Sequence, residues 1–167
     1  MKVAVLCPGP SLKKTWNPKN PYQVILAVNR AALVQQPHWW VAGDWMYLKD
    51  TAAKPITGYC TIRDVVRILE DGTLLPKERM PAKFECVAWE DLPFQRSFSV
   101  VAALGLACHL GARDVHVYGD DKNGANDFDG WVGYNRGHSR WEEETAAMNA
   151  GIDFLNTRNI IVTRIKG

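Results

Sequence analysis

Small and polar residues directly follow the first apolar run of the chain, in the segment Pro8-Gly9-Pro10-Ser11. If a helix begins after this turn, free backbone N–H groups and the positive end of the helix dipole could bind a phosphate or a carboxylate. The segment matches neither the GxGxxG dinucleotide fingerprint nor the P-loop pattern, which argues against a standard NAD site and a Walker ATPase. The alternative is a tight turn in which Ser11 caps a helix.

Asn29, Arg30 and three aspartates follow other apolar runs. The Asn29 amide can both donate and accept hydrogen bonds, as recognition of a base or a ribose requires, and the Arg30 guanidinium could pair with a phosphate. Asp44, Asp120 and Asp121 could bind ribose hydroxyls or Mg²⁺. All these residues are also common in turns, so their types alone leave both interpretations open.

His138 lies in a segment rich in glycine and aromatic residues, 129–139, at the start of a Ser139-x-x-Glu142 capping box. A loop that enters a helix could present the imidazole to a pocket, where it would act as a general base near neutral pH. The alternative is a solvent-exposed loop histidine.

Short apolar runs that end in glycine or polar residues predict buried strands at 3–7, 24–28, 39–42, 115–118 and 160–163. Helical patterns cover 99–110, with Gly111 as a stop, and 139–155. The sequence therefore predicts one α/β domain over 1–167, a Rossmann-like, open, mainly parallel sheet with helices on both faces. A less regular lid or insertion is expected around 45–95. Ligands bind such sheets beyond the carboxyl ends of the strands, where the polar residues named above collect.

Composition excludes several further classes of protein. The 20 basic and 18 acidic residues give a net charge of +2, without a basic run, so we expect no nucleic-acid partner. Four widely spaced cysteines fit neither a zinc site nor a disulfide scaffold and indicate buried thiols in a reducing compartment. No apolar run is long enough to span a bilayer, so we expect a cytoplasmic protein without a transmembrane segment.

Four segments in the same order resemble one family. They are Leu6–Leu12 with its GPSL ending, Val28-Asn29-Arg30, Gln95-Arg96-Ser97-Phe98-Ser99 with the 107–121 continuation, and Gly137-His138-Ser139. In these segments the chain resembles the bacterial sialyltransferases of lipooligosaccharide synthesis. It resembles more distantly the pterin-pyrophosphokinase-like domains that share the GPSL opening.

The resemblance implies an inverting, metal-independent glycosyltransferase that needs no cofactor. It would move a sugar from a CMP-linked or other nucleotide-activated donor to a hydroxyl of a glycan or small-molecule acceptor. Arg96 and His138 would flank the reaction centre, with His138 as the general base. The residues implied to line the cytidine-nucleotide site are Gly9, Pro10, Ser11, Asn29, Ser99 and Asp121.

The chain departs from the family pattern at two places. Pro8 replaces an asparagine that helps to hold the nucleotide, and Lys122 begins the stretch in which the family carries two tyrosines that bind the leaving phosphate. A lysine could take over that role through its charge, so Lys122 is a catalytic candidate.

Two other functions stay open. One is a Mg²⁺-dependent, pyrophosphokinase-like phosphotransferase, in which Asp44, Asp120 and Asp121 would hold the metal and the Gly-Pro-Ser turn would hold ATP phosphates. The other is a nucleotide-binding domain without catalysis.

Overall fold

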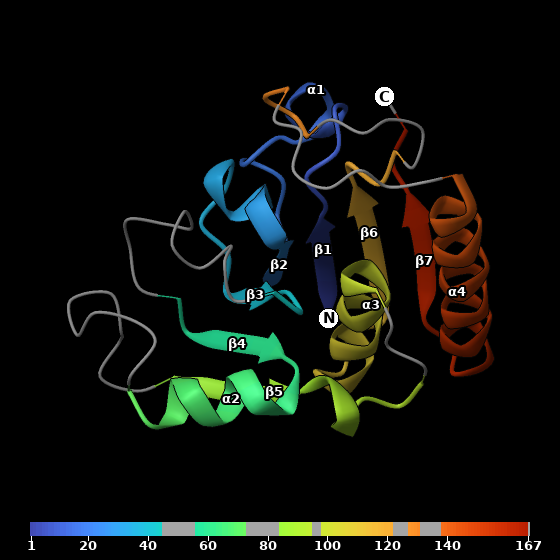
Figure 1. The fold of residues 1–167 in the computed structure, drawn as a ribbon. Coiled ribbons are helices and arrows are strands. Elements are labelled where there is room, and N and C mark those ends of the chain that lie inside the picture. Colours follow the sequence, from blue (N-terminus) through green and yellow to red (C-terminus); the bar gives the residue numbers. More distant parts are fainter. Residues whose placement is uncertain (45–55, 73–83, 95–97, 122–126, 131–137, 167) are drawn as a thin grey trace.

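The fold is a single parallel β-sheet with helices on both of its faces (Figure 1). The computed structural model describes residues 1–44, 56–72, 84–94, 98–121, 127–130 and 138–166, and only the backbone at 138 and 139. Its seven strands lie in the order β5-β4-β3-β2-β1-β6-β7, and every neighbouring pair is parallel. The strands are β1 (Lys2–Leu6), β2 (Val24–Val28), β3 (Trp39–Val41), β4 (Gly58–Thr61), β5 (Glu85–Ala88), β6 (Asp114–Tyr118) and β7 (Ile161–Arg164). The predicted Rossmann-like α/β class is confirmed.

The central strands are apolar along their whole length because both of their faces are covered. On one face, Val3 and Val5 of β1 join a core with α3 (Ser99–His109) and with Met148 and Leu155 of α4 (His138–Thr157). On the other face, Ala4 and Leu6 join a core with short elements. These are α1 (Leu12–Thr15), the 3₁₀ turn η1 (Asn29–Leu33) and α2 (Arg63–Glu70). A second 3₁₀ turn, η4 (Trp89–Asp91), follows β5.

The predicted elements agree with the observed ones to within a few residues. The last helix starts at His138, one residue before the predicted start, and α3 ends at His109 ahead of Gly111, which has φ +88°. Within the region 45–95, the described residues form β4, α2, β5 and η4, which extend the same sheet beyond β3. Strands β4 and β5 therefore pair in parallel at one edge of the sheet. The sequence pattern did not predict this strand order.

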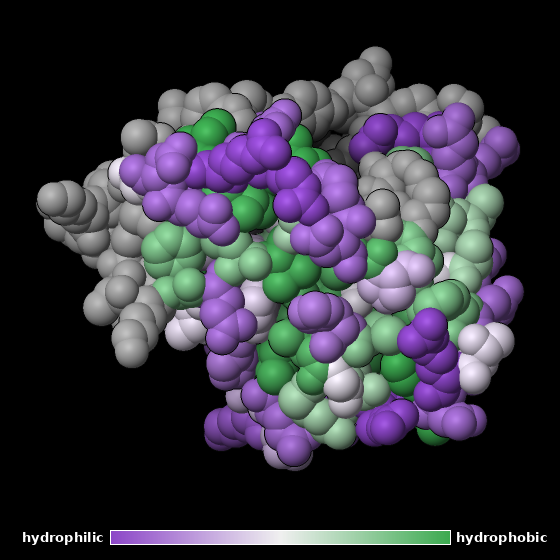
Figure 2. Space-filling view, turned by 90° about the horizontal axis from the view of Figure 1, so that it is seen from below, coloured by the Kyte–Doolittle hydropathy of each residue, from purple (hydrophilic) through white to green (hydrophobic). Residues whose placement is uncertain are grey.

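The face at the amino ends of the strands is seen from below in Figure 2. Hydrophilic residues occupy much of its rim, and hydrophobic residues show between them. No helix in the described ranges is long and apolar enough to cross a membrane.

Thr61 is a buried polar residue whose replacement should stabilise the protein. It ends β4, its exposure is 0%, and its Oγ1 has no hydrogen-bond partner in the part of the chain that the structure describes. A buried hydroxyl without a partner keeps its desolvation cost, so Thr61→Val should raise the free energy of unfolding by about 1 kcal/mol. The matched control is Thr57→Val, because Thr57 Oγ1 donates a 2.7 Å bond to the His38 carbonyl. Urea unfolding should show opposite shifts for the two variants, and destabilisation by Thr61→Val would contradict the assignment.

Candidate nucleotide site at the switch point of the sheet

The order of the strands reverses between β1 and β6, and the two strand ends meet closely there. From β1 the chain moves outward to β2 and onward to β5, whereas β6 and β7 lie on the other side of β1. Gly9 N–H donates to the Gly119 carbonyl at 2.9 Å, and Cys7 N–H donates to the Tyr118 carbonyl at 2.8 Å. A β-carbon at Gly9 would lie 2.2 Å from the Gly119 oxygen. Such a switch point is where open α/β sheets bind their ligands.

The turn after β1 does not offer the free N–H groups that its sequence suggested. Gly9 N–H is bonded to Gly119, and Ser11 N–H donates to Asp121 Oδ2 at 2.8 Å. The helix that follows, α1, has only four residues. The Asp121 carboxylate thus occupies a position where an anion could accept from Ser11 N–H, and the phosphate cradle expected at this turn stays a prediction.

The Ser11 hydroxyl is buried without a hydrogen-bond partner among the described residues. It does not cap α1, although Ser11 stands at the N-cap position, so the capping interpretation of this residue is also wrong. A hydroxyl can both donate and accept, and none of the described residues uses this capacity of Ser11 Oγ, although the Asp121 carboxylate accepts from the Ser11 N–H.

Asn29 presents a second acceptor without a partner at the end of the neighbouring strand β2. Its backbone is left-handed, with φ +50°, which asparagine tolerates better than most residues. The Asn29 carbonyl accepts a 3.1 Å bond from Nε1 of the fully buried Trp40, and this contact supports the conformation. Within the described ranges its buried Oδ1 has no partner. Two buried polar atoms at the same edge of the sheet, on Ser11 and Asn29, thus have no partner in the part of the chain that the structure describes.

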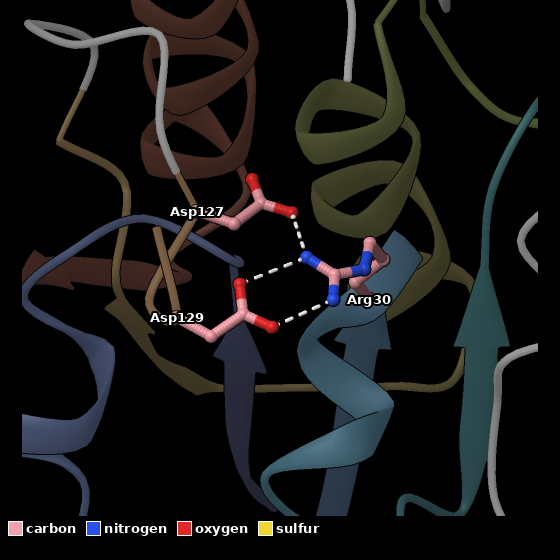
Figure 3. A network of polar contacts seen from close by, with 3 residues as sticks. All are labelled: Arg30, Asp127 and Asp129. Carbon is pink, nitrogen blue, oxygen red and sulfur yellow. Dashed lines mark hydrogen bonds and ion pairs between the residues drawn. The ribbon is translucent and has the colours of Figure 1, made fainter. Parts of the chain in front are cut away.

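Arg30 is held by two aspartates, as Figure 3 shows. Its Nη1 donates to Asp127 Oδ2 at 2.9 Å and to Asp129 Oδ1 at 3.0 Å, and its Nη2 donates to Asp129 Oδ2 at 2.7 Å. The bonds to Asp129 and then to Asp127 raise the pKa of Arg30, which keeps the guanidinium charged. Protein carboxylates thus hold both terminal nitrogens of Arg30, the residue that the sequence analysis expected to pair with a phosphate.

Asp120 is likewise engaged inside the protein. Its side chain is only 7% exposed and accepts a 2.9 Å bond from Nη2 of Arg164 in β7. Among the described residues, no group of three His, Cys, Asp or Glu side chains could hold a metal ion. The Mg²⁺ site suggested for Asp44, Asp120 and Asp121 is therefore not assembled, since Asp120 pairs with arginine and Asp121 accepts from Ser11 N–H.

The other candidate residues are distributed as follows. Pro10 is exposed in the turn after β1, Asp44 follows β3 at the carboxyl edge of the sheet, and Ser99 is the first residue of α3. Arg96 and Lys122 lie outside the described residues. His138 begins α4, but its side chain is also outside the described part.

The sequence analysis missed three residues that organise this edge, namely Asp127, Asp129 and Arg164. Each pairs with a candidate that the sequence had singled out, at separations of 97, 99 and 44 residues. Opposite charge is the only signal that the sequence carries for such pairs, and it does not select one partner among many.

The fold defines a class: a Rossmann-like α/β domain whose strand order reverses between β1 and β6. No protein-family model matches the chain, and no curated protein is similar to it in sequence.

Solved structures of the sialyltransferase CST-II are similar to this chain in fold. The complex with a trisaccharide acceptor and CMP matches with a TM-score of 0.60 at 13% identity, over 98% of this chain and 80% of that chain. The Campylobacter jejuni enzyme with the substrate analogue CMP-3FNeuAc matches with a TM-score of 0.58 at 14% identity, over 98% and 79%. The resemblance predicted from the motifs is thus confirmed for the fold.

Proposed function

We propose that the chain is a sialyltransferase-like glycosyltransferase that takes a sugar from a CMP-linked donor. The observation that carries the proposal is that two buried atoms near the switch point, Ser11 Oγ and Asn29 Oδ1, have no hydrogen-bond partner among the residues that the structure describes. Leaving such atoms unsatisfied is costly, so a ligand with hydrogen-bond donors is the expected partner. CMP supplies such donors in its ribose hydroxyls and in the amino group of cytosine. The solved structures of similar fold include a complex with CMP and one with the substrate analogue CMP-3FNeuAc.

The proposed reaction is an inverting transfer in which this chain supplies a base and a positioned donor. His138 would take the proton of the acceptor hydroxyl while its oxygen forms a bond to the anomeric carbon of the sugar. The bond from that carbon to the phosphate oxygen breaks, and CMP leaves with the electron pair. Arg96 would lie beside the reaction centre, and the ammonium group of Lys122 would stabilise the negative charge that develops on the leaving phosphate. This route needs no metal ion, and its acceptor would be a glycan or a small molecule with a free hydroxyl.

Calorimetric titration tests the proposal directly. The purified protein is titrated with CMP, CDP, UDP, GDP and ATP, each with and without Mg²⁺. We expect binding of CMP or CDP that does not depend on Mg²⁺. Binding of ATP only with Mg²⁺ would favour the phosphotransferase instead, and binding of CMP without turnover of any CMP-sugar would indicate a non-catalytic nucleotide-binding domain.

Asn29→Gly should weaken CMP binding about tenfold, because it removes the unpartnered amide oxygen. Glycine accepts the left-handed backbone at this position, so the change leaves the local conformation unstrained. Asn159→Gly is the matched control, since Asn159 has φ +62° in the turn between α4 and β7. The dissociation constant for CMP should rise only for Asn29→Gly, and an unchanged value would remove Asn29 from the site.

A further inference from the structure

The segment 127–130 is attached to the end of β2 by an ion-pair cluster that spans a long separation in the chain. Arg30 stands next to Asn29 at the start of η1, and its side chain is 9% exposed. Asp127 is 18% and Asp129 is 35% exposed, so solvent screens this cluster less than an ordinary surface pair. Because Arg30 meets both oxygens of Asp129, the geometry of the cluster is fixed as well as its charge.

The same segment is also attached to the turn after β1. Phe128 N–H donates a 2.7 Å bond to the Pro8 carbonyl. The Phe128 ring lies 5.6 Å from the guanidinium carbon of Arg30 and 5.1 Å from Lys13 Nζ, measured to the ring centroid. The segment therefore joins the carboxyl ends of β1 and β2, where Ser11 Oγ and Asn29 Oδ1 have no partner within the described ranges.

We infer that Arg30 is a positioning residue for the donor site and not a ligand of the donor phosphate. The Arg30–Asp127–Asp129 cluster fixes the backbone next to Asn29 and anchors segment 127–130 against the β1 turn. In the sequence this anchor stands between Lys122 and His138, the two groups proposed to act on the leaving phosphate and on the acceptor. The inference rests on the proposed function for the identity of the donor, but the anchoring itself does not.

The variant Asp129→Asn distinguishes between Arg30 as a phosphate ligand and Arg30 as a positioning residue. If Arg30 were a phosphate ligand, weakening its protein partner would free the guanidinium, and CMP would bind as well or more tightly. If Arg30 positions the site, Asp129→Asn and Arg30→Gln should both weaken CMP binding, by about tenfold. Cytidine lacks the phosphate. Its affinity, measured by competition with CMP, should fall by the same factor in both variants. Tighter CMP binding by Asp129→Asn, or a loss for CMP but not for cytidine in Arg30→Gln, would overturn the inference.

Hydrogen exchange tests the anchor without any ligand. The Phe128 amide should exchange faster in Arg30→Gln than in the unchanged protein, and Arg30→Lys should be intermediate because lysine keeps the charge but cannot bind Asp129 through two parallel bonds. The matched control is Arg63→Gln. That variant breaks the Arg63–Asp91 pair, whose side chains are 44% and 58% exposed, and should leave both Phe128 exchange and CMP binding unchanged.

The two parts can fail separately. Absence of CMP binding by the unchanged protein would reject the proposed donor, while faster Phe128 exchange in Arg30→Gln would still support the anchor. Unchanged exchange at Phe128 in a folded Arg30→Gln variant, as judged by thermal melting, would reject the anchor even if CMP binds.

Discussion

Gly119→Ala should lower the free energy of unfolding by about 3–4 kcal/mol, which is the largest stability change that we expect for a single residue at the site. Gly119 has φ +69°, and a β-carbon there would lie 2.2 Å from the Cys7 carbonyl oxygen. That oxygen belongs to the backbone at the end of β1, where Cys7 N–H donates to the Tyr118 carbonyl. It can move away only if β1 and β6 separate at the switch point.

Gly72→Ala is the control that isolates this clash from backbone strain. Gly72 has φ +71°, but no atom of the described residues lies within 4 Å of a β-carbon at that position. Its replacement should lower the free energy of unfolding by about 1–2 kcal/mol, because only the left-handed backbone is strained there. Denaturant unfolding measures both variants, and equal losses at the two positions would mean that the contact between the β1 and β6 ends can widen freely.

His138→Ala should reduce the rate of sugar transfer about 10²–10⁴-fold, which is the largest change in activity that we expect. Removal of a general base leaves the acceptor hydroxyl protonated as its oxygen attacks, so the chemical step slows. The donor is held by other groups in the proposed site, so the dissociation constant for CMP should stay the same. The measurement is single-turnover release of CMP from a CMP-sugar in the presence of an acceptor.

The control for this prediction is His109→Ala, which removes an exposed histidine at the end of α3. It should leave both the transfer rate and CMP binding unchanged. A transfer rate for His138→Ala close to that of the unchanged protein would exclude His138 as the base. A loss of CMP binding in His138→Ala would mean that His138 helps to hold the donor.

The four cysteines show which properties could be predicted from composition and spacing alone. None of the four forms a disulfide in the structure, in line with their spacing. Burial raises the pKa of Cys60, and it raises the pKa of Cys86 to about 11, so both stay protonated at neutral pH. The expectation of burial holds for Cys7 and Cys60, whereas Cys86 and Cys108 are only partly buried.

The sequence by itself determined the local elements and the edge of the sheet that carries the candidate site. Runs such as Val3–Cys7 are apolar because both faces of a central parallel strand are buried, and this requirement acts on each strand separately. Polar residues that follow those runs must lie at the carboxyl edge, so the positions of Ser11, Asn29 and Asp121 could be predicted without knowledge of the strand order.

Only the tertiary structure decided what each polar group at that edge is free to do. Arg30, Asp120 and the Ser11 N–H are the groups that the sequence offered to a phosphate or a metal, yet each has a partner within the protein. At that edge, Ser11 Oγ and Asn29 Oδ1 have no partner among the described residues. The physical reason is that a charge or an N–H group is satisfied by whichever partner the topology brings within about 3 Å. Here that partner is 44 to 110 residues away in the chain, beyond the reach of any local pattern.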